Sequence, residues 1–250
     1  IFRRYPKILA PFKYAGYPLL LEAITIEDGD HRFLADDRSP VLEIATKLCW
    51  LTCVCCTLNG EELFRSDGLA ILSNLLSRLS SILPRDAATS FTGSRIMTYC
   101  VRTLAGLGAF EAAREAFFAK PALVHDVMKA IKYDNAPSIV EASVHCISQM
   151  AASADLQDLM LKLGVLWHLI PMLFDYDVSM EDSSIEVEIN SEGKLSFLDQ
   201  FISSEVECTN MQYAKNKLAI LAAHAISRLS GLLGGHLKTP RLSLIHISEP

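Results

Sequence analysis

The sequence has few charged residues, no long apolar run and no cysteine pattern typical of disulfide bonds. Charged residues make up 21% of the 250 positions and apolar residues 50%, a composition that argues against global disorder. The longest uncharged run in an apolar helical pattern, Leu48–Gly60, is shorter than the ~20 residues that a bilayer span needs. We therefore predict no transmembrane segment.

The cysteine count indicates the redox compartment of the protein, and the net charge indicates which classes of partner to expect. Seven cysteines, an odd number, favour a reducing compartment, so a cytoplasmic location is expected. The net charge of −6 gives no reason to expect nucleic acid as a partner. Because the chain starts at Ile1 rather than Met, we expect it to be a fragment.

The last residues, LSLIHISEP (242–250), resemble the one-frame translation of a transposase adapter used in short-read library preparation. We interpret them as a sequencing artefact and expect the native sequence to be lost near Arg241. Finding these codons in genomic DNA would refute this interpretation.

No metal site is predicted, although the stretch LCWLTCVCCTL contains a CxxC. A zinc site needs a second ligand pair, or histidines at a matching spacing on a turn, and neither follows. We expect the cysteines of this stretch to be small apolar residues on a helix: Cys49, Cys53, Cys55 and Cys56.

No catalytic or cofactor-binding residue is predicted either. His145 and Cys146 are adjacent, so on a helix they cannot face each other as a nucleophilic pair. His168, beside Trp167, is expected to be a core or edge histidine. The glycines of GLLGGH (231–236) follow the last helical pattern and are interpreted as its C-terminal cap, because no phosphate-binding loop motif is present.

Basic and aromatic residues alternate near the start of the chain. Such a patch is compatible with contact to phosphate or lipid headgroups. We favour the alternative that it forms the polar rim of a terminal helix whose aromatic side chains pack inward. The patch comprises Arg3, Arg4, Lys7 and Lys13 with Phe2, Tyr5, Phe12 and Tyr14.

Apolar helical patterns recur along the chain, each introduced by a glycine or a proline. Gly16, Gly68, Pro121 and Gly164 occupy this place, at spacings of 52, 53 and 43 residues. Armadillo and HEAT repeats have periods of ~40–47 residues. The clearest unit, 140–174, predicts a helix ending near Ala152, a short helix, a glycine and a long packing helix. We therefore predict an all-α fold, an armadillo/HEAT-like alpha-solenoid of stacked helix pairs.

A second helical pattern follows each of these patterns. Its apolar residues alternate steps of three and four, which aligns them on one helix face that should be buried. The predicted faces are Val41, Ile44, Leu48, Leu51, Cys55 and Leu58; Met97, Val101 and Leu104; Ile139, Ala142, Cys146 and Met150; and Leu218, Leu221, Ala225, Leu229 and Leu232.

The segment 175–207 interrupts the helical pattern with ten acidic residues and one lysine. Like charges at this density oppose packing, so we predict an acidic disordered insertion. A solvated spacer is the favoured interpretation, and a short linear motif is the alternative. The predicted organisation is therefore helical repeats over 1–174, the insertion over 175–207, a closing long helix over 208–238 and the artefact over 242–250.

Four stretches resemble, in order, one protein family. They are LAPFKYAGYPLLLEAITIE (9–27), NGEELFRSDGLAIL (59–72), GVLWHLIPMLFDYD (164–177) and AAHAISRLSGLL (222–233). They resemble the receptor-mediated endocytosis protein 8 family, also called DnaJ homolog subfamily C member 13. The resemblance covers residues 5 to about 238 and implies a segment C-terminal to the J domain.

The resemblance implies a role at early endosomes. Members of the family are large peripheral endosomal proteins whose J domain recruits a heat-shock cognate chaperone, and they act in endocytosis and sorting with sorting nexin and the WASH complex. The His-Pro-Asp tripeptide of a J domain is absent from these residues, so no co-chaperone activity is expected of them. We expect a non-catalytic scaffold without cofactors, whose association with the membrane uses other regions.

Two other functions remain open at this point. A generic armadillo-type adaptor unrelated to endosomes is the main alternative, although the helices lack the repeated Trp-x-x-x-Asn pattern of a transport receptor. An enzyme is less favoured because no catalytic constellation is present.

Overall fold

The computed structural model describes residues 16–27, 34, 38–55, 57–88, 91–178 and 211–231. Every regular element in this part of the chain is a helix, which confirms the all-α prediction. The helices are α1 (Tyr17–Ile24), α2 (Ser39–Cys55), α3 (Thr57–Arg65), α4 (Gly68–Ile82), α5 (Thr92–Leu107), α6 (Glu111–Phe118), α7 (Pro121–Ala130), α8 (Pro137–Met150), α9 (Ala154–Lys162), α10 (Leu166–Leu173) and α12 (Met211–Leu229).

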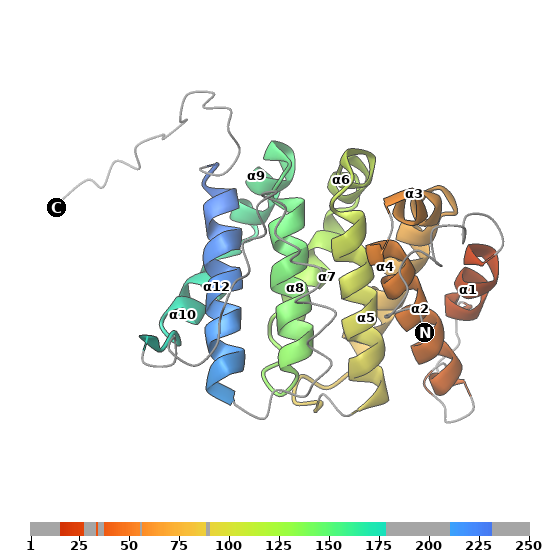
Figure 1. Cartoon of the computed structure of the whole chain (residues 1–250), viewed down its shortest axis with the longest axis horizontal. Coiled ribbons are helices and arrows are strands. Elements are labelled where there is room, and N and C mark those ends of the chain that lie inside the picture. Colours follow the sequence, from red (N-terminus) through yellow and green to blue (C-terminus); the bar gives the residue numbers. More distant parts are fainter. Residues whose placement is uncertain are drawn as a thin grey trace.

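The helices form an array of units that are stacked side by side. Figure 1 shows the long helices α2, α5, α8 and α12 in sequence order across the molecule, and each packs on the next. The short helices α3, α6 and α9 lie at one end of them. The third helix of each unit packs against the following long helix, as α4 does on α5, α7 on α8 and α10 on α12. The alpha-solenoid is confirmed, with units of three helices rather than two.

The interior long helices bury the faces that their periodicity predicts. Met97, Val101 and Leu104 on α5 are completely buried, and so are Ile139, Ala142, Cys146 and Met150 on α8. On α12, Leu221, Ala225 and Leu229 are buried and Leu218 is partly buried, whereas Leu232 lies outside the described residues. One continuous apolar core therefore runs from α1 to α12.

The predicted face of the first long helix is wrong. Val41 and Ile44 are 55% and 60% exposed, and Leu58 does not belong to α2 because a new helix, α3, starts at Thr57. The buried face of α2 instead carries Leu42, Ala45, Cys49 and Cys53. This helix has two apolar faces, and α5 covers only one side of it.

The turns before the predicted glycines and proline are tight. Gly164 has φ +80° at the C-terminal end of α9, and the Val165 amide donates to the Met160 carbonyl at 3.1 Å, as in a Schellman cap. Gly68 is needed for close approach, because a Cβ there would lie 2.6 Å from the Leu63 carbonyl oxygen. Pro121 occupies the first turn of α7, where its missing N–H costs no hydrogen bond.

In the sequence, the acidic insertion falls between α10 and α12. Its first residues, 175–178, are held against α12, because Asn216 accepts a hydrogen bond from the Asp177 amide at 2.9 Å and donates to the Asp177 carbonyl at 2.8 Å. The predicted disorder of the insertion, the basic patch and the adapter-like tail concern residues 179–210, 1–15 and 242–250, which lie outside the described residues. The helix α12 falls within the predicted 208–238 segment.

The continuous core predicts a large difference between two identical substitutions. Leu72 on α4 is completely buried, so Leu72→Ala should lower the free energy of unfolding by about 2–5 kcal/mol through lost burial and a cavity. Leu19 on α1 is 68% exposed, so Leu19→Ala should change it by less than about 0.5 kcal/mol. Denaturant unfolding of both variants measures this difference, and equal losses would contradict the described core.

Candidate functional site

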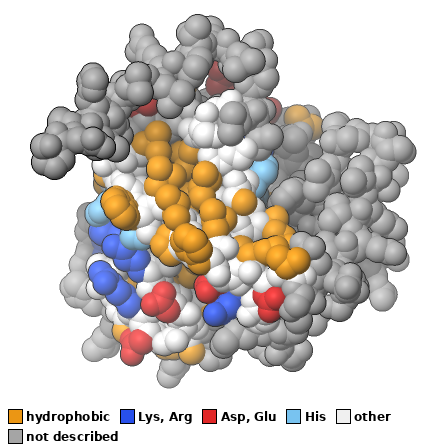
Figure 2. Space-filling model, turned by 90° about the vertical axis from the view of Figure 1, so that its left-hand side faces the viewer, with side chains coloured by type: hydrophobic (Ala, Val, Ile, Leu, Met, Phe, Trp, Pro, Cys, Tyr) orange, Lys and Arg blue, Asp and Glu red, His pale blue; other side chains and the backbone are white. Residues whose placement is uncertain are grey.

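A stripe of large apolar side chains is exposed on α10. Trp167 and Phe174 are each 84% exposed and Ile170 is 43% exposed, although their spacing places them on one helix face. Leu169 is the buried residue of this eight-residue helix, which is shorter than the long packing helix predicted after Gly164. Figure 2 views this end of the molecule and shows hydrophobic side chains gathered on it. We call Trp167, Ile170 and Phe174 the α10 stripe.

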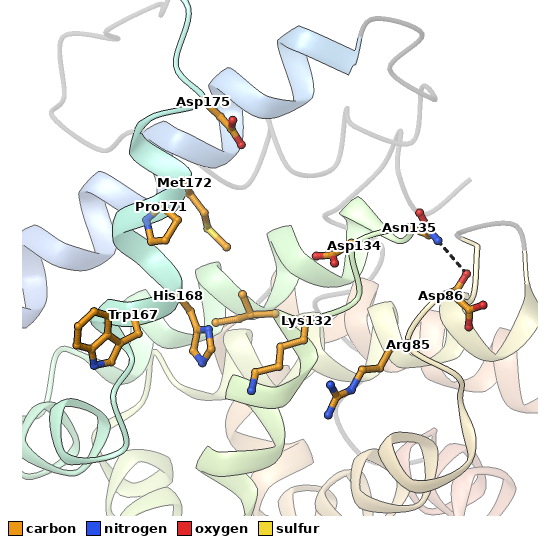
Figure 3. Close-up of a pocket in the computed structure, with 11 residues that line it drawn as sticks. Arg85, Asp86, Lys132, Asp134, Asn135, Trp167, His168, Pro171, Met172 and Asp175 are labelled. Atoms are coloured by element: carbon orange, nitrogen blue, oxygen red, sulfur yellow. Dashed lines mark hydrogen bonds between the residues drawn. The ribbon is translucent and has the colours of Figure 1, made fainter.

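A pocket of about 610 Å³ adjoins the α10 stripe. It lies between α10 and the loops that follow α4 and α7, and Trp167 belongs to both the stripe and the pocket. Figure 3 shows the side chains around it. The lining residues are Arg85, Asp86, Ile131, Lys132, Asp134, Asn135, Trp167, His168, Pro171, Met172 and Asp175.

Charged side chains of both signs line the pocket. Figure 3 shows Lys132 between His168 and Arg85, with Asp86 beside Arg85 and with Asp134 and Asp175 further up. Pro171 and Met172 lie between His168 and Asp175. A ligand that fills the pocket therefore meets cationic, anionic and apolar groups.

Lys132 acts electrostatically on His168 in the pocket. Burial, together with the charge of Lys132, lowers the pKa of the His168 imidazole. Within the described part of the chain, neither Arg85 nor Lys132 forms an ion pair, whereas Asp175 lies 3.8 Å from the ammonium of Lys215. Arg85 and Lys132 can therefore contact an anionic group of a ligand.

Two loops of the pocket are tied together. The Asn135 side-chain amide, in the loop before α8, donates to the Asp86 carbonyl in the loop after α4 at 3.2 Å. The Tyr133 hydroxyl donates to the Leu83 carbonyl at 3.3 Å. These bonds hold the charged side chains on fixed backbone, which reduces the conformational entropy lost when a ligand binds.

The cysteines of LCWLTCVCCTL do not form a reactive site in the described residues. Cys49 and Cys53 are buried on α2, as expected for small apolar residues, and burial raises the pKa of the Cys49 thiol to about 12. Cys55 ends α2, and Cys56 lies outside the described residues. The described residues contain no group of three or more His, Cys, Asp or Glu side chains positioned to hold a metal ion.

His145 and His168 occupy two different environments. His145 lies on α8, and its Nε2 is 3.1 Å from the side-chain nitrogen of Gln149, which donates to it. Cys146 points into the core and is completely buried, so the two adjacent side chains do not act together. His168 is half-buried and lines the pocket, which makes it an edge histidine.

Comparison with known proteins identifies the chain's relatives. Over 240 residues, the chain is 38% identical to the DnaJ homolog subfamily C GRV2 of Arabidopsis thaliana. The chain belongs to the receptor-mediated endocytosis protein 8 family. The aligned region covers 96% of this chain and 9% of the length of the plant protein. No family model and no solved structure matches the chain.

No single helix in the described part of this family member is long and apolar enough to cross a bilayer. Taken together, α9 and α10 are long and apolar enough, but the two helices are bent by 86°.

Sequence reasoning missed the pocket of this family member. Arg85 and Lys132 lie in loops of different units, and only the stacking of those units brings them to one place. The charged residues that follow α4 and α7 at similar positions were the available signal. Trp167 was noted, but the periodicity of α10 predicted packing rather than exposure.

The environment of His145 predicts a pH-dependent stability. Burial and the charges of Arg228, Arg102, His224 and Lys217 lower the pKa of His145 from 6.5 to about 4. The unfolded chain therefore takes up a proton near pH 6.5 and the folded chain only near pH 4. Stability is complete above pH 6.5 and falls by ~3 kcal/mol as the pH drops towards 4.

His145→Gln should remove this part of the pH dependence. Denaturant unfolding at several pH values between 7 and 4 measures it for the variant and the original chain. The same substitution at His125, which is exposed on α7, controls for the general loss of a histidine. A variant whose stability still falls as steeply as that of the original chain would contradict the assignment to His145.

Proposed function

We propose that this chain is a non-catalytic scaffold segment of an endosomal DnaJ co-chaperone that acts in receptor-mediated endocytosis, endosome organisation and endosomal protein sorting. The identity of 38% to a DnaJ subfamily C protein over 96% of the chain supports the family part of this proposal. The observation that carries the binding role is the α10 stripe, which exposes two large aromatic side chains beside a pocket.

The scaffold acts by presenting a fixed surface to other proteins. Aromatic side chains supply much of the affinity of protein interfaces, because they bury a large area with little loss of conformational freedom. Trp167 and Phe174 are such side chains, on a helix whose other face is packed on α12. The surface therefore binds without any chemical step.

The pocket adds selectivity to this surface. An extended segment of a partner contacts the α10 stripe with apolar side chains and places an acidic group near Arg85 and Lys132. The carboxylate of Asp134, which also lines the pocket, then accepts a basic group of the same segment. Opposite charges at defined places favour one orientation of the segment over the reverse.

The proposed partners and location rest on the family resemblance. Sorting nexin and the WASH complex are the proposed partners of the longer protein, and its J domain is the proposed site for a heat-shock cognate chaperone. The protein is proposed to lie peripherally on early endosomes, with its membrane contacts in regions outside this chain. The chain spans 9% of the length of the plant relative.

Substitution of the α10 stripe tests the proposed function. Trp167→Ala combined with Phe174→Ala should weaken binding of purified sorting nexin or WASH-complex subunits at least about tenfold, because such aromatic residues carry ~2 kcal/mol or more in interfaces. The free energy of unfolding should change by less than about 1 kcal/mol, because both side chains are 84% exposed.

Leu19→Ala is the matched control, since Leu19 is an exposed apolar residue on α1 at the other end of the array. It should leave partner binding unchanged. Unaltered binding by the double variant would refute the α10 stripe as the partner site. Specific binding of neither partner by the original chain would argue for an adaptor that works outside endosomal sorting.

A further inference from the structure

Three nitrogen-bearing side chains of the pocket make no hydrogen bond within the described part of the chain. Among the described residues, Arg85 and Lys132 have no hydrogen-bond or ion-pair partner, and the ring nitrogens of His168 have no hydrogen-bond partner. All three line the same pocket, and Figure 3 shows Lys132 between the other two. Their hydrogen-bonding capacity is therefore available to a ligand.

The backbone that carries these side chains is fixed. Lys132 directly precedes Tyr133, whose hydroxyl donates to the Leu83 carbonyl at 3.3 Å. Arg85 follows Leu83 by two residues, so this bond joins the two loops close to both cations. His168 lies on α10, which packs against α12. Positions that are fixed before a ligand arrives reduce the entropy lost on binding.

His168 is uncharged at neutral pH in the free chain. Its pKa is lowered from 6.5, first by burial and then by the charge of Lys132. A neutral imidazole keeps one N–H group, and its second nitrogen can take up a proton. An anionic group that enters the pocket therefore meets two permanent cations and one group that can become a cation.

Carboxylates also line the pocket. They are Asp86 and Asp134, in the loops after α4 and α7, and Asp175 after α10. Asp175 lies 3.8 Å from the ammonium of Lys215 on α12. Among the described residues, Lys132 is the charge that shifts the pKa of His168. A ligand carboxylate placed beside the imidazole therefore supplies an opposite charge that the free chain does not supply there.

An anion that binds beside an imidazole raises the pKa of that imidazole. An opposite charge within ~4–6 Å favours the charged form, commonly by about one pKa unit or more. His168 would then take up a proton from the solvent when the anion binds, and the imidazolium would donate a charge-assisted hydrogen bond to it. The same proton returns to the solvent when the ligand dissociates.

We propose that His168 binds the acidic group of the partner segment together with Arg85 and Lys132, and that its imidazole takes up a proton as it does so. The inference rests on the proposed function, because it concerns the segment that contacts the α10 stripe. It adds regulation to that site. A segment with a carboxylate at this place binds more tightly as the pH falls, and a segment with an amide there does not.

The pH range of the effect follows from the two states of His168. Its pKa is higher in the complex than in the free chain, so the gain in affinity begins as the pH falls through the pKa of the complex. The gain is complete below the pKa of the free chain, which is under 6.5. A difference of about one pKa unit corresponds to about tenfold tighter binding.

Two synthetic peptides test the proposal on the 250-residue chain. The first, N-acetyl-Leu-Leu-Glu-Gly-Lys amide, carries apolar side chains for the α10 stripe, one acid and one base. The control peptide has Gln in place of Glu. Both are titrated into histidine-labelled protein between about pH 8 and about pH 5.5, and the imidazole NMR signals are recorded.

The two peptides should differ in their response to pH. The dissociation constant of the Glu peptide should fall about tenfold from about pH 8 to about pH 5.5, whereas that of the Gln peptide should change less than about twofold. The pKa of His168 should rise by about one unit in the complex with the Glu peptide. The pKa of His125, which is exposed on α7, should stay the same with either peptide.

Substitution of the histidine separates proton uptake from simple contact. His168→Gln should bind the Glu peptide at about pH 8 within about twofold of the original chain, but without the rise in affinity at lower pH. His125→Gln should keep that rise. The NMR titration uses the original chain, so it does not depend on how well either variant folds.

The results that contradict the inference are distinct from those that contradict the proposed function. Equal affinity of the Glu peptide across the pH range, the same pH dependence for the Gln peptide, or no binding of either peptide would each overturn the role of His168. Binding of purified partners that requires Trp167 and Phe174 but involves no proton uptake at His168 would refute this inference alone. Partner binding that ignores the α10 stripe would instead refute the proposed function.

Discussion

Burial between neighbouring long helices is the constraint on which this molecule depends. A three-helix unit cannot bury its apolar face alone, so α5 and α8 are stable because each packs between two other long helices. The same constraint explains why apolar side chains are exposed at both ends of the described array. Ile44 on α2 and Trp167 on α10 are exposed near the two ends of the described array, whereas the interior long helices α5 and α8 bury the apolar faces that their periodicity predicts.

Polar contacts between the long helices have a different role. The bidentate pair of Arg95 with Glu43, at 2.8 and 2.9 Å, joins α5 to α2 at a partly exposed position. Exposed ion pairs of this kind contribute little stability, because solvent screens them. Such ion pairs instead help to fix the register of one helix relative to the next. Lys217 with Glu141 does the same between α12 and α8.

The sequence predicts the interior of this fold better than its edges. Period-3.6 patterns identified the buried faces of α5, α8 and α12, because in a solenoid interior the apolar side and the packed side coincide. On α2 the pattern of Val41 and Ile44 was equally regular, but no described helix covers it. The pocket could not be predicted, because Arg85 and Lys132 meet only after α4 and α7 have stacked. The four stretches that resemble the family identified the relatives of the chain, but they did not indicate which face of the solenoid binds a partner.

The segment 175–178 connects the pocket to α12. Asp175 lines the pocket, and its carbonyl accepts a hydrogen bond from Gln212 on α12. Asp177, two residues later, is bound on both backbone groups by Asn216. The backbone on this side of the pocket is therefore held by the last long helix, while the other side is formed by loops after α4 and α7, so a ligand in the pocket contacts three consecutive units of the array at once.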